Sequence, residues 1–583
     1  MKIERTKNAS RNIVFGVILK IYTLAVPFLI RTLMIYFMGV EYLGLNSLFT
    51  SILQVLNLTE LGVGSAMVYS MYKPIVDDDK EKICQLMRLY RTYYRVIGLV
   101  IAVVGCILIP FIPNLIAEDS LATLPPEINV YILYGLNLAA TVLTYWLFAY
   151  KNCLLNAHQR NDVSSKISIV ITTLQYGLQI VAIIFGNYYI YVIVALATQA
   201  LNNVITALIT TKMYPDYKPV GKMPKSEIKN INRRILDLFT SKIGGTVTNS
   251  FDTIVVSTFL GLTVLAIYQN YFYIVTAITG MIYIIFNSCT AGIGNSIISE
   301  TKEKNYNDFK KFTLLTMWIV AFCTSCFLCL FQPFMQVWVG EELMLGFSFV
   351  ILLCIYFVFY EMNAFFSLFK DAAGAWHEDR WRPLTSSLAN LVMNLIFVQF
   401  WGLYGVILST IISQAVISIP WLLYNLFTTI YDKKDLKAYV TNIIVYLFVI
   451  ILVSGITYVP CYFINFDNAW VTFFIRLVVC CIVPNAIFII LYHKTVEFKE
   501  VLGLINRITR GKIKFLRKYE NLPQPVTVNV TGQQSSVNVQ SDMVDIEQPV
   551  EAKLLDDNSQ LPESVNIKSE QDTGSTENDP NRK

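Results

Sequence analysis

The chain has 583 residues, of which 55% are hydrophobic and only 15% are charged. Soluble domains carry about 25% charged residues and their single cores stop growing at roughly 250–300 residues, so this composition excludes a soluble enzyme, a collagen-like chain and a disulfide scaffold, and indicates a membrane protein. The net charge of +5 joins two unlike parts, because residues 519–583 are strongly acidic and the rest of the chain is strongly basic.

Apolar stretches long enough to cross a bilayer recur along most of the chain. A spanning helix needs about 20 mostly apolar residues. Fourteen stretches meet this requirement: 13–38, 45–70, 93–116, 128–150, 163–186, 188–211, 235–260, 265–299, 312–338, 345–369, 383–402, 404–430, 438–464 and 469–492. Pro27, Pro333, Pro420 and Pro460 fall inside them, where helical bundles tolerate proline as a kink. We therefore predict an all-α polytopic membrane protein with 14 transmembrane helices.

The basic residues are confined to alternate connections between these stretches. All but four of the 46 Lys and Arg residues lie in the N-terminal segment, in or within four residues of the even-numbered loops, or after residue 492, and the odd-numbered loops contain none. Acids such as Glu118, Asp119 and Glu341 lie in the odd-numbered loops instead. Because Lys and Arg accumulate in cytoplasmic loops, this alternation predicts that both termini are cytoplasmic and supports the count of fourteen spans.

The loops predicted to face away from the cytoplasm are all short. None exceeds about a dozen residues, which is the length of a plain connection. An enzyme acting on that side needs polar side chains there, so we predict that the protein is not an enzyme and has no catalytic residues.

The C-terminal part changes character twice. Residues 494–518 combine many bases with Phe498, Val501, Ile505 and Ile508 on one helical face. This pattern is typical of a basic amphipathic helix on the anionic inner leaflet; the alternative is a solvated basic flank. Residues 519–583 contain one aromatic residue, at their start, and too little apolar surface to fold, so we predict a disordered acidic tail.

An internal repeat divides the spans into two halves. Lys20 and Lys242 precede the span-ending Gly39 and Gly261 by the same number of residues, 19. Two further matches are Arg31 and Asp252, eleven and ten residues after these lysines, and Gly62-Val-Gly64 and Gly292-Ile-Gly294, which close spans 2 and 8. The simplest explanation is two pseudo-symmetric six-helix halves plus an added C-terminal helix pair, with a parallel repeat axis along the membrane normal.

This organisation predicts six segments. They are an N-lobe (1–211, spans 1–6), a cytoplasmic linker (212–234), a C-lobe (235–430, spans 7–12), the added span pair 13–14 (431–492), the basic amphipathic helix (493–518) and the disordered acidic tail (519–583).

Charged side chains inside spans indicate function or pairing, because a Lys, Arg or Asp at a helix centre costs about 2.5–3.5 kcal/mol. Lys20 and Lys242 lie at the same depth of corresponding helices, and Arg31 follows on the first of them. We predict that these three cations line a cavity, with snorkelling to the membrane surface as the alternative. Such a cavity suits a phosphate or diphosphate, which Lys and Arg bind strongly.

Four further charges inside spans have less defined roles. Glu60, Asp252 and Glu361 are candidates for ion coupling or for counter-ions, and Glu60 or Asp252 is a possible partner of Arg31. Arg476 belongs to the added pair, where a structural contact between helices is expected.

Residues that usually hold metals or cofactors form no functional pattern. The three histidines lie far apart at span ends. The run Cys323, Cys326 and Cys329 has the spacing of iron–sulfur ligands but lies inside a span without a suitable fourth cysteine, where Cys acts as a small apolar side chain. No phosphate-loop motif occurs. We predict no metal, no cofactor and no nucleic-acid partner.

The opening seventy residues carry a family resemblance. The chain resembles the Wzx-type O-antigen and capsule flippases of the multidrug/oligosaccharidyl-lipid/polysaccharide (MOP) exporter superfamily over spans 1–12, most specifically in RNIVFGVILKIYTLAVPFLIRTLMIYFMGVEYLGLNSLFTSILQVLNLTELGVGSAMVYSMYKPI. Spans 13–14 resemble the added pair of the related peptidoglycan-precursor flippases. The acidic tail has no counterpart in this resemblance.

The resemblance implies a mechanism and a substrate. Two six-helix lobes would face a V-shaped cavity and rock between inward and outward states. An undecaprenyl-diphosphate-linked oligosaccharide would move from the inner to the outer leaflet of the cytoplasmic (inner) membrane of a bacterium, for surface polysaccharide biosynthesis such as O-antigen, capsule or lipopolysaccharide. Lys20, Arg31 and Lys242 would hold the diphosphate. The implied partners are this polyprenyl-diphosphate-linked glycan, membrane lipids and, as a further candidate, glycan polymerase machinery.

Two alternatives from the same superfamily stay open. A multidrug or metabolite antiporter would favour carboxylates over lysines in the first span. A peptidoglycan-precursor (lipid II) flippase would share the span count and the diphosphate chemistry.

Overall fold

The computed structural model describes residues 5–60 and 62–508, without the side chains of residues 5–14, 17, 237, 241, 242, 285, 287, 288, 291, 507 and 508. These residues form helices and their connections, and the described part of the chain contains no strand. The fold is therefore the all-α membrane architecture that the apolar stretches predict. The acidic tail predicted to be disordered lies outside the described residues.

The first part of the chain forms mostly long helices. They are α1 (Arg5–Phe37), α2 (Val40–Leu56), α3 (Val63–Val76), α4 (Lys80–Leu108), α5 (Glu118–Thr123), α6 (Val130–Trp146), α7 (Asn152–Ala157), α8 (Asn161–Ile184) and α9 (Tyr188–Met213), with 3₁₀ turns η1 (Asn57–Glu60), η2 (Ile109–Phe111), η3 (Pro113–Leu115) and η4 (Ala149–Lys151). Asparagine side chains cap the N-termini of two of these helices: Asn129 accepts hydrogen bonds from the first amides of α6, and Asn187 accepts one from an amide of α9. These caps satisfy helix-end donors that would otherwise lack partners.

The second part continues in the same way. Its elements are α10 (Lys225–Ser299), α11 (Lys302–Val339), η5 (Glu341–Leu343), α12 (Phe347–Ala372), α13 (Trp376–Asp379), α14 (Arg382–Ile412), the π-helical turn η6 (Ser413–Ser418), α15 (Ile419–Thr429), η7 (Lys433–Asp435), α16 (Leu436–Phe463), α17 (Ala469–Tyr492) and α18 (Val496–Ile508). Pro27, Pro333 and Pro460 lie inside helices α1, α11 and α16, which confirms that these prolines do not end their spans.

Eleven helical segments among the described residues are long and apolar enough to cross a membrane, or twelve if the bent pair α6 and α7 counts as one. Two of the eleven, Ile243–Ile284 with 42 residues and Trp376–Thr429 with 54, are at least twice as long as the roughly 30 Å hydrocarbon core requires. Each contains one glycine with a non-helical backbone, Gly261 or Gly402. The breaks allow two crossings in each segment; the count of fourteen stays a prediction.

The backbone of Gly261 also bears on the internal repeat. Gly39, between α1 and α2, has φ 117° and ψ 161°, and Gly261, inside α10, has φ 88° and ψ 172°. Both positions need glycine because side chains rarely adopt a positive φ. At Gly261 a Cβ atom would also lie 2.3 Å from the Ser120 hydroxyl oxygen. The two glycines that the spacing matches therefore end their helices with a similar backbone.

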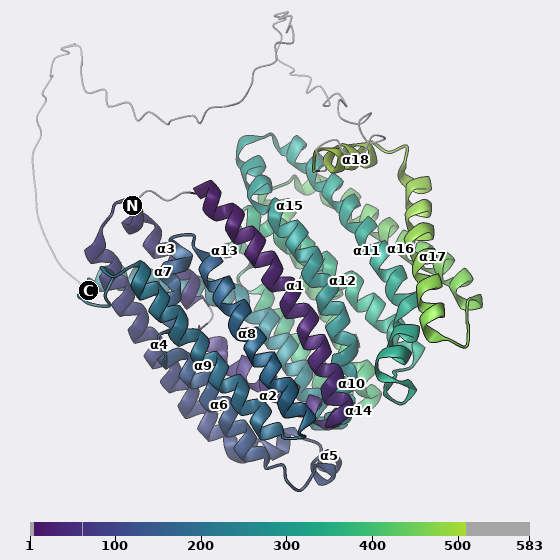
Figure 1. The fold of residues 1–583 in the computed structure, drawn as a ribbon. Helices are drawn as coiled ribbons and strands as arrows, with labels where there is room; N and C mark the ends of the chain where they lie inside the picture. Colours follow the sequence, from purple (N-terminus) through teal and green to yellow (C-terminus); the bar gives the residue numbers. More distant parts are fainter. Residues whose placement is uncertain (1–4, 61, 509–583) are drawn as a thin grey trace, which may run out of the picture. The chain divides into compact units, whose positions relative to one another are not determined.

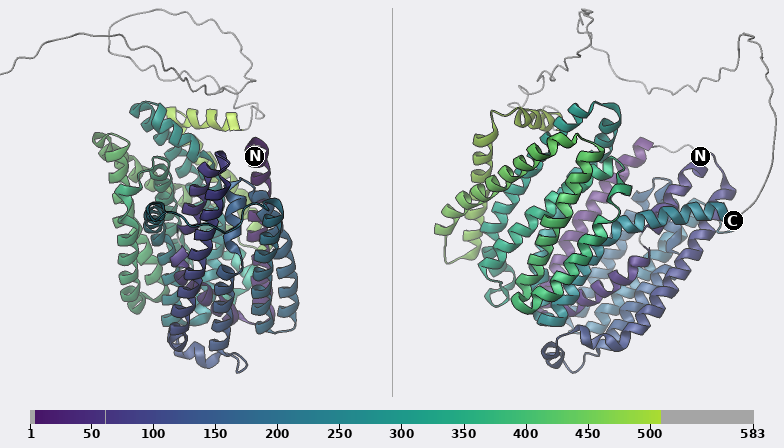
Figure 2. Two further views of the ribbon diagram at one scale, coloured as in Figure 1. Left: turned by 90° about the vertical axis from the view of Figure 1, so that its left-hand side faces the viewer. Right: turned by 180° about the vertical axis from the view of Figure 1, so that it is seen from behind.

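The helices pack side by side and run mostly along one direction (Figure 2). In Figure 1, α1 crosses the middle of the bundle, with α8 and α9 on one side and α11 and α12 on the other. The helix α10 packs closely along both α2 and α14. At Gly44 of α2, a Cβ atom would lie 2.2 Å from the carbonyl oxygen of Leu262, so glycine is required for this approach.

The basic connections contact one another. Lys80 pairs with Asp216 at 2.7 Å, which joins the α3–α4 connection to the segment before α10, and Lys310 approaches Glu497 of α18 at 3.8 Å. The helix α18 and the start of α1 lie at one end of the helices, and α5 lies at the other (Figure 1). We call these the basic end and the acidic end.

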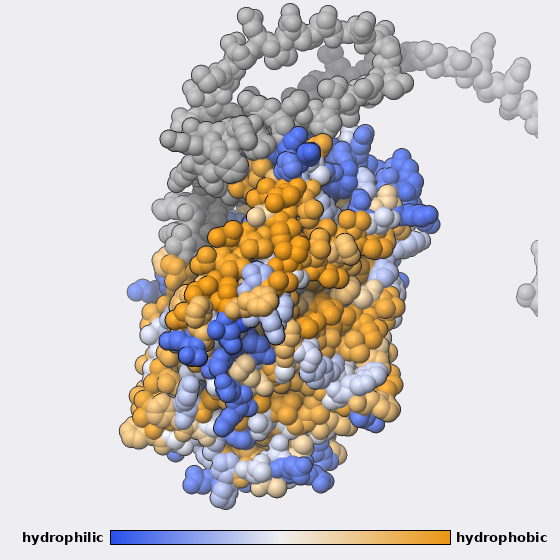
Figure 3. Space-filling view, turned by 90° about the vertical axis from the view of Figure 1, so that its right-hand side faces the viewer, coloured by the Kyte–Doolittle hydropathy of each residue, from blue (hydrophilic) through white to orange (hydrophobic). Residues whose placement is uncertain are grey.

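The helix α18 covers residues 496–508 of the segment predicted to form the basic amphipathic helix; residues 509–518 lie outside the described residues. Its apolar residues Phe498 and Val501 are buried against α11, with the Phe498 ring 5.4 Å from that of Trp318. The apolar face of α18, which the sequence predicts to contact the lipid leaflet, is therefore at least partly covered by α11. Apolar residues cover much of the neighbouring surface on the side of α16 and α17, between polar ends (Figure 3).

Candidate functional site

Two predicted site residues lie on one face of α1. Lys20 and Arg31 are separated by eleven residues, which is close to three helical turns and about 16 Å. This face contacts α10 in antiparallel order: Lys20 lies beside Gly280, the Tyr273 hydroxyl donates to the Leu24 carbonyl, and Arg31 reaches Asn270. The two helices form a seam, defined here by these contacts.

Arg31 leaves hydrogen-bond donors without acceptors at the seam. Its Nε donates to Asn270 Oδ1 at 3.3 Å, and its guanidinium lies 5.3 Å from the centre of the Tyr273 ring. Arg31 Nη2 and Asn270 Nδ2 are buried and have no partner among the described residues. Both are donors, so an anionic oxygen is the group that would satisfy them.

The two predicted lysines, Lys20 and Lys242, lie on α1 and α10. The side chain of Lys20 is exposed, and the described residues provide no ion-pair partner for its ammonium group. Lys242 lies in α10, but its side chain is outside the described residues. The seam therefore brings Lys20 and Arg31 onto one surface, while the predicted contribution of Lys242 stays untested.

Glu60 does not pair with Arg31. It lies in η1, where its Oε1 accepts a hydrogen bond of 2.8 Å from the Tyr94 hydroxyl, which in turn accepts one of 2.7 Å from Tyr90. Neutral phenols thus surround this carboxylate on the α4 side. The described residues hold no ion pair between Arg31 and either Glu60 or Asp252, so the predicted pairing is wrong.

Asp252 lies at the centre of a buried polar network between α10 and the two helical parts of α14. Its carboxylate accepts hydrogen bonds from the Asn394 amide and, at 3.2 Å, from the Thr410 hydroxyl. Asn390 donates to Thr410 at 2.9 Å and to Ser409 at 3.3 Å. These partners are all neutral. The cluster offers oxygen atoms around one negative charge, the ligand type that hard cations prefer.

Glu361 and Arg476 lie apart from the seam. Glu361 of α12 is buried, with 3% of its surface exposed, and its Oε1 has no hydrogen-bond partner among the described residues. Arg476 of α17 donates to the carbonyl oxygens of Ile464 at 2.9 Å and Cys329 at 3.2 Å. These contacts fit the structural role expected for Arg476, because they connect α17 to α11 and to the end of α16.

Sequence reasoning missed a polar pocket between α10, α12, α14 and η6. Arg382 lies on its wall, and its side chain is buried against Asp379. Ser387, Asn390 and Asn394 follow at intervals of three and four residues, which places them on one face of a helix; of these, Ser387 lines the pocket, and the two asparagines belong to the Asp252 network. By hydropathy alone this stretch is an apolar span.

Soft metal ligands also meet where the C-x2-C-x2-C run did not predict them. The Sγ atoms of Cys329, Cys461 and Cys480 lie within 4.8 Å of one another, on α11, α16 and α17. Thiolates at such a spacing suit zinc or copper(I), and Cys is equally at home as a small apolar side chain. Cys323 is not part of this group.

Part of the chain is similar to a known protein family. The chain matches the family model described as "Polysaccharide biosynthesis protein" over residues 9–290, just under half of its length. Over these residues the chain is similar to that family. The matched part includes Lys20, Arg31, Glu60, Lys242 and Asp252, and ends before Glu361.

Two solved structures show the fold. A structure described as "Lipid II flippase MurJ, inward closed conformation" aligns with a TM-score of 0.61 and 17% identity over 83% of this chain and 100% of its own. An inward-facing multidrug resistance MATE family transporter of the MOP superfamily aligns with a TM-score of 0.53 and 18% identity, over 71% of this chain and 96% of its own. No curated protein matches the chain.

Proposed function

We propose that this protein is a flippase that moves an undecaprenyl-diphosphate-linked oligosaccharide from the inner to the outer leaflet of the cytoplasmic membrane of a bacterium, for surface polysaccharide biosynthesis. The family match supports the polysaccharide pathway, and the fold shared with MurJ and MATE transporters supports transport by alternating access rather than enzymatic chemistry. Membrane lipids and glycan polymerase machinery are the proposed partners.

The seam between α1 and α10 is the observation that carries this proposal. Arg31 Nη2 and Asn270 Nδ2 are buried donors without acceptors, and Lys20 adds a second cation on the same face of α1. An unsatisfied buried polar group costs about 1–3 kcal/mol, and a diphosphate supplies several acceptor oxygens. Lys20 and Lys242 receive the diphosphate in this scheme, and closure passes it towards Arg31.

The proposed topology has 14 transmembrane helices. Two six-helix halves are related by the internal repeat, and α16 and α17 form the added C-terminal pair. The breaks at Gly261 and Gly402 support the division of the two overlong segments. Because cytoplasmic loops collect Lys and Arg, the basic end faces the cytoplasm, and both termini lie there.

Among the three carboxylates, Asp252 is our candidate for ion coupling. Its charge is held by neutral groups only, so a proton or a small cation can bind without displacing an ion-pair partner. Glu60 with its tyrosines and Glu361 are assigned as counter-ions to the cavity cations.

Replacing both Lys20 and Lys242 with glutamine tests the proposal in cells. We expect surface glycan to disappear while the protein still inserts into the membrane, because the long polar side chains remain but the charges that bind diphosphate are lost. The matched control is Lys434→Gln, since Lys434 lies outside the spans and is largely exposed. Normal surface glycan in the double variant would contradict the assignment.

Deletion of the gene separates this function from its nearest alternatives. We expect the lipid-linked oligosaccharide to accumulate on the inner leaflet while its synthesis continues. Unchanged pools of this lipid would favour a multidrug or metabolite antiporter. Rescue of a strain that lacks its lipid II flippase would favour the peptidoglycan branch, to which the greater coverage by MurJ points.

A further inference from the structure

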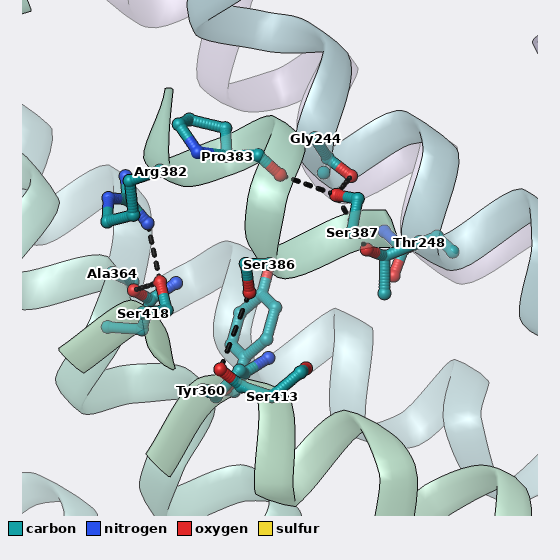
Figure 4. A pocket seen from close by; sticks show the side chains of 14 residues that line it. Gly244, Thr248, Tyr360, Ala364, Arg382, Pro383, Ser386, Ser387, Ser413 and Ser418 are labelled. Carbon is teal, nitrogen blue, oxygen red and sulfur yellow. Dashed lines mark hydrogen bonds between the residues drawn. The ribbon is translucent and has the colours of Figure 1, made fainter. Parts of the chain in front are cut away.

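A polar pocket lies between α10, α12, α14 and η6 (Figure 4). Its volume is about 220 Å³. Nine of its fourteen lining residues carry a hydroxyl or amide group, and none carries a carboxylate. A π-helical turn contributes part of the wall, and such turns are common at functional sites.

The pocket is polar but electrically neutral. Arg382 is its one charged lining residue, and its guanidinium donates to both carboxylate oxygens of Asp379 at 2.7 and 2.8 Å and to Ser418 at 2.5 Å. Asp379 also accepts Lys370 at 3.3 Å, and Lys370 pairs with Asp371 at 2.7 Å. Two cations and two carboxylates therefore balance, which leaves little charge to attract a phosphate.

The remaining groups match the chemistry of a sugar. Hydroxyl and amide groups both donate and accept hydrogen bonds, as sugar hydroxyls do. The buried Oε1 atom of Gln414 has no partner among the described residues and is available as an acceptor. The volume is smaller than the roughly 300–1,000 Å³ of sites for drug-sized ligands, so it suits a single ring better than a chain of sugars.

Two adjacent glycines of α10 line the pocket. A Cβ atom on Gly244 would lie 2.7 Å from the Pro383 carbonyl oxygen, so this glycine lets α10 approach α14. A Cβ atom on Gly245 would meet nothing within 4 Å, which leaves open space at the pocket wall. Lys242, a proposed diphosphate ligand, precedes Gly244 by two residues, or about 3 Å along the helix axis.

We propose that this pocket binds one sugar unit of the lipid-linked glycan, next to the diphosphate. The assignment rests on the proposed flippase function and adds to it a sugar-recognition site in the second half of the molecule. The seam binds the charged diphosphate, whereas the neutral pocket distinguishes the attached sugar. The pocket therefore sets which glycan is moved.

The test uses the full-length protein in proteoliposomes with two probes. One is the lipid-linked oligosaccharide purified from membranes of the deletion strain, and the other is undecaprenyl diphosphate without sugar. The variant Gly245→Leu places a side chain into the open space at the pocket. Gly455→Leu is the matched control, because Gly455 is exposed in α16 and a Cβ atom there also meets nothing within 4 Å.

We expect Gly245→Leu to raise the KM for the oligosaccharide-linked probe by about ten-fold or more, as for the loss of one or two buried hydrogen bonds. Movement of the sugar-free probe stays unchanged, and Gly455→Leu behaves as the wild type. A second variant, Gln414→Leu, removes the free acceptor while nearly preserving volume, and shifts KM in the same direction.

The outcomes separate this inference from the proposed function. Equal effects of Gly245→Leu on both probes, or no effect on either, would overturn the sugar site while the flippase function stands. A wild-type protein that moves neither probe would overturn the proposed function itself. If size-exclusion chromatography in detergent shows that Gly245→Leu does not fold, Gln414→Leu becomes the test. An unchanged KM of Gln414→Leu for the oligosaccharide-linked probe would then overturn the sugar site.

Discussion

Arg31 and Asp252 occupy nearly corresponding places in the two halves of the sequence, yet the protein treats their charges in opposite ways. Arg31 keeps one donor without an acceptor, beside the equally unpartnered amide nitrogen of Asn270. Asp252 has both of its oxygens occupied, by Asn394 and Thr410. A charged side chain whose hydrogen bonds are all made within the protein, such as Asp252, stabilises the fold or binds a small ion. A charged side chain with unpaired donors, such as Arg31, can bind a ligand that supplies acceptors.

The comparison follows from the energetics of burial. Leaving a buried donor unsatisfied costs about 1–3 kcal/mol, so such donors are rare unless a ligand completes them. The network around Asp252 avoids this cost with neutral partners, and a neutral network adjusts to the presence or absence of one small cation more readily than an ion pair does.

The first prediction concerns Arg31→Gln. We expect transport of the lipid-linked oligosaccharide to fall by about 100-fold, because hydrogen bonds to charged groups contribute about 1.5–3 kcal/mol each and at least one is lost. Stability in detergent should stay unchanged or rise, since the variant removes a buried charge that the protein itself does not pair. Transport assays in proteoliposomes and thermal unfolding measure the two effects.

Arg476→Gln is the matched control for this prediction. Arg476 donates to two main-chain carbonyl oxygens and has a structural role, so its replacement should lower stability by about 1–3 kcal/mol and leave the KM for substrate unchanged. If Arg31→Gln instead lost stability and kept its transport rate, Arg31 would be a scaffold residue and the comparison would fail.

The second prediction concerns Asp252. Asp252→Leu removes the carboxylate that accepts from Asn394 and Thr410, although Thr410 still donates to the Val406 carbonyl at 3.3 Å and Asn394 to Asn390 at 3.4 Å. We therefore expect the free energy of unfolding to fall by about 1–3 kcal/mol in total. Asp252→Asn keeps one acceptor oxygen and should unfold close to the wild type. Thermal unfolding in detergent distinguishes the two variants.

A functional measurement completes this test. Asp252→Asn removes the charge but not the network, so transport should lose its response to an imposed sodium or proton gradient while binding of the lipid-linked oligosaccharide is retained. A gradient response equal to that of the wild type would show that Asp252 only stabilises the helices.

Much of the fold could be predicted from the sequence because membrane spans leave a strong signal. The boundaries of α8, α9, α16 and α17 agree with the predicted spans within a few residues. The exceptions are local: η6 and the breaks at Gly261 and Gly402 lie inside continuous apolar stretches. Hydropathy measures only average polarity, so it cannot show where the backbone leaves helical geometry.

The candidate site was less accessible to sequence reasoning. Helical periodicity alone places Lys20 and Arg31 on one face of α1, because eleven residues are close to three turns. The partner of Arg31 was predicted by charge, as Glu60 or Asp252, and the structure shows a neutral amide instead, Asn270. Which residue of a distant helix lies opposite depends on packing, and residues such as Asn270 carry no charge that would single them out.

The third and smallest prediction extends the comparison to a buried group outside the spans. His158, between α7 and α8, is 4% exposed, with its Nδ1 2.8 Å from the Leu154 carbonyl oxygen and its ring 4.4 Å from that of Tyr214. Burial lowers the pKa of His158 below its usual 6.5. The unfolded chain therefore binds a proton more readily, so the stability that the neutral ring contributes is complete above about pH 6.5 and declines as the pH falls.

We expect the wild-type Tm to fall more between about pH 7.5 and about pH 5.5 than that of His158→Gln. Equal slopes would mean that His158, like Asp252, is held by groups that accept either charge state, and the distinction between satisfied and unsatisfied charges would then not extend beyond the membrane.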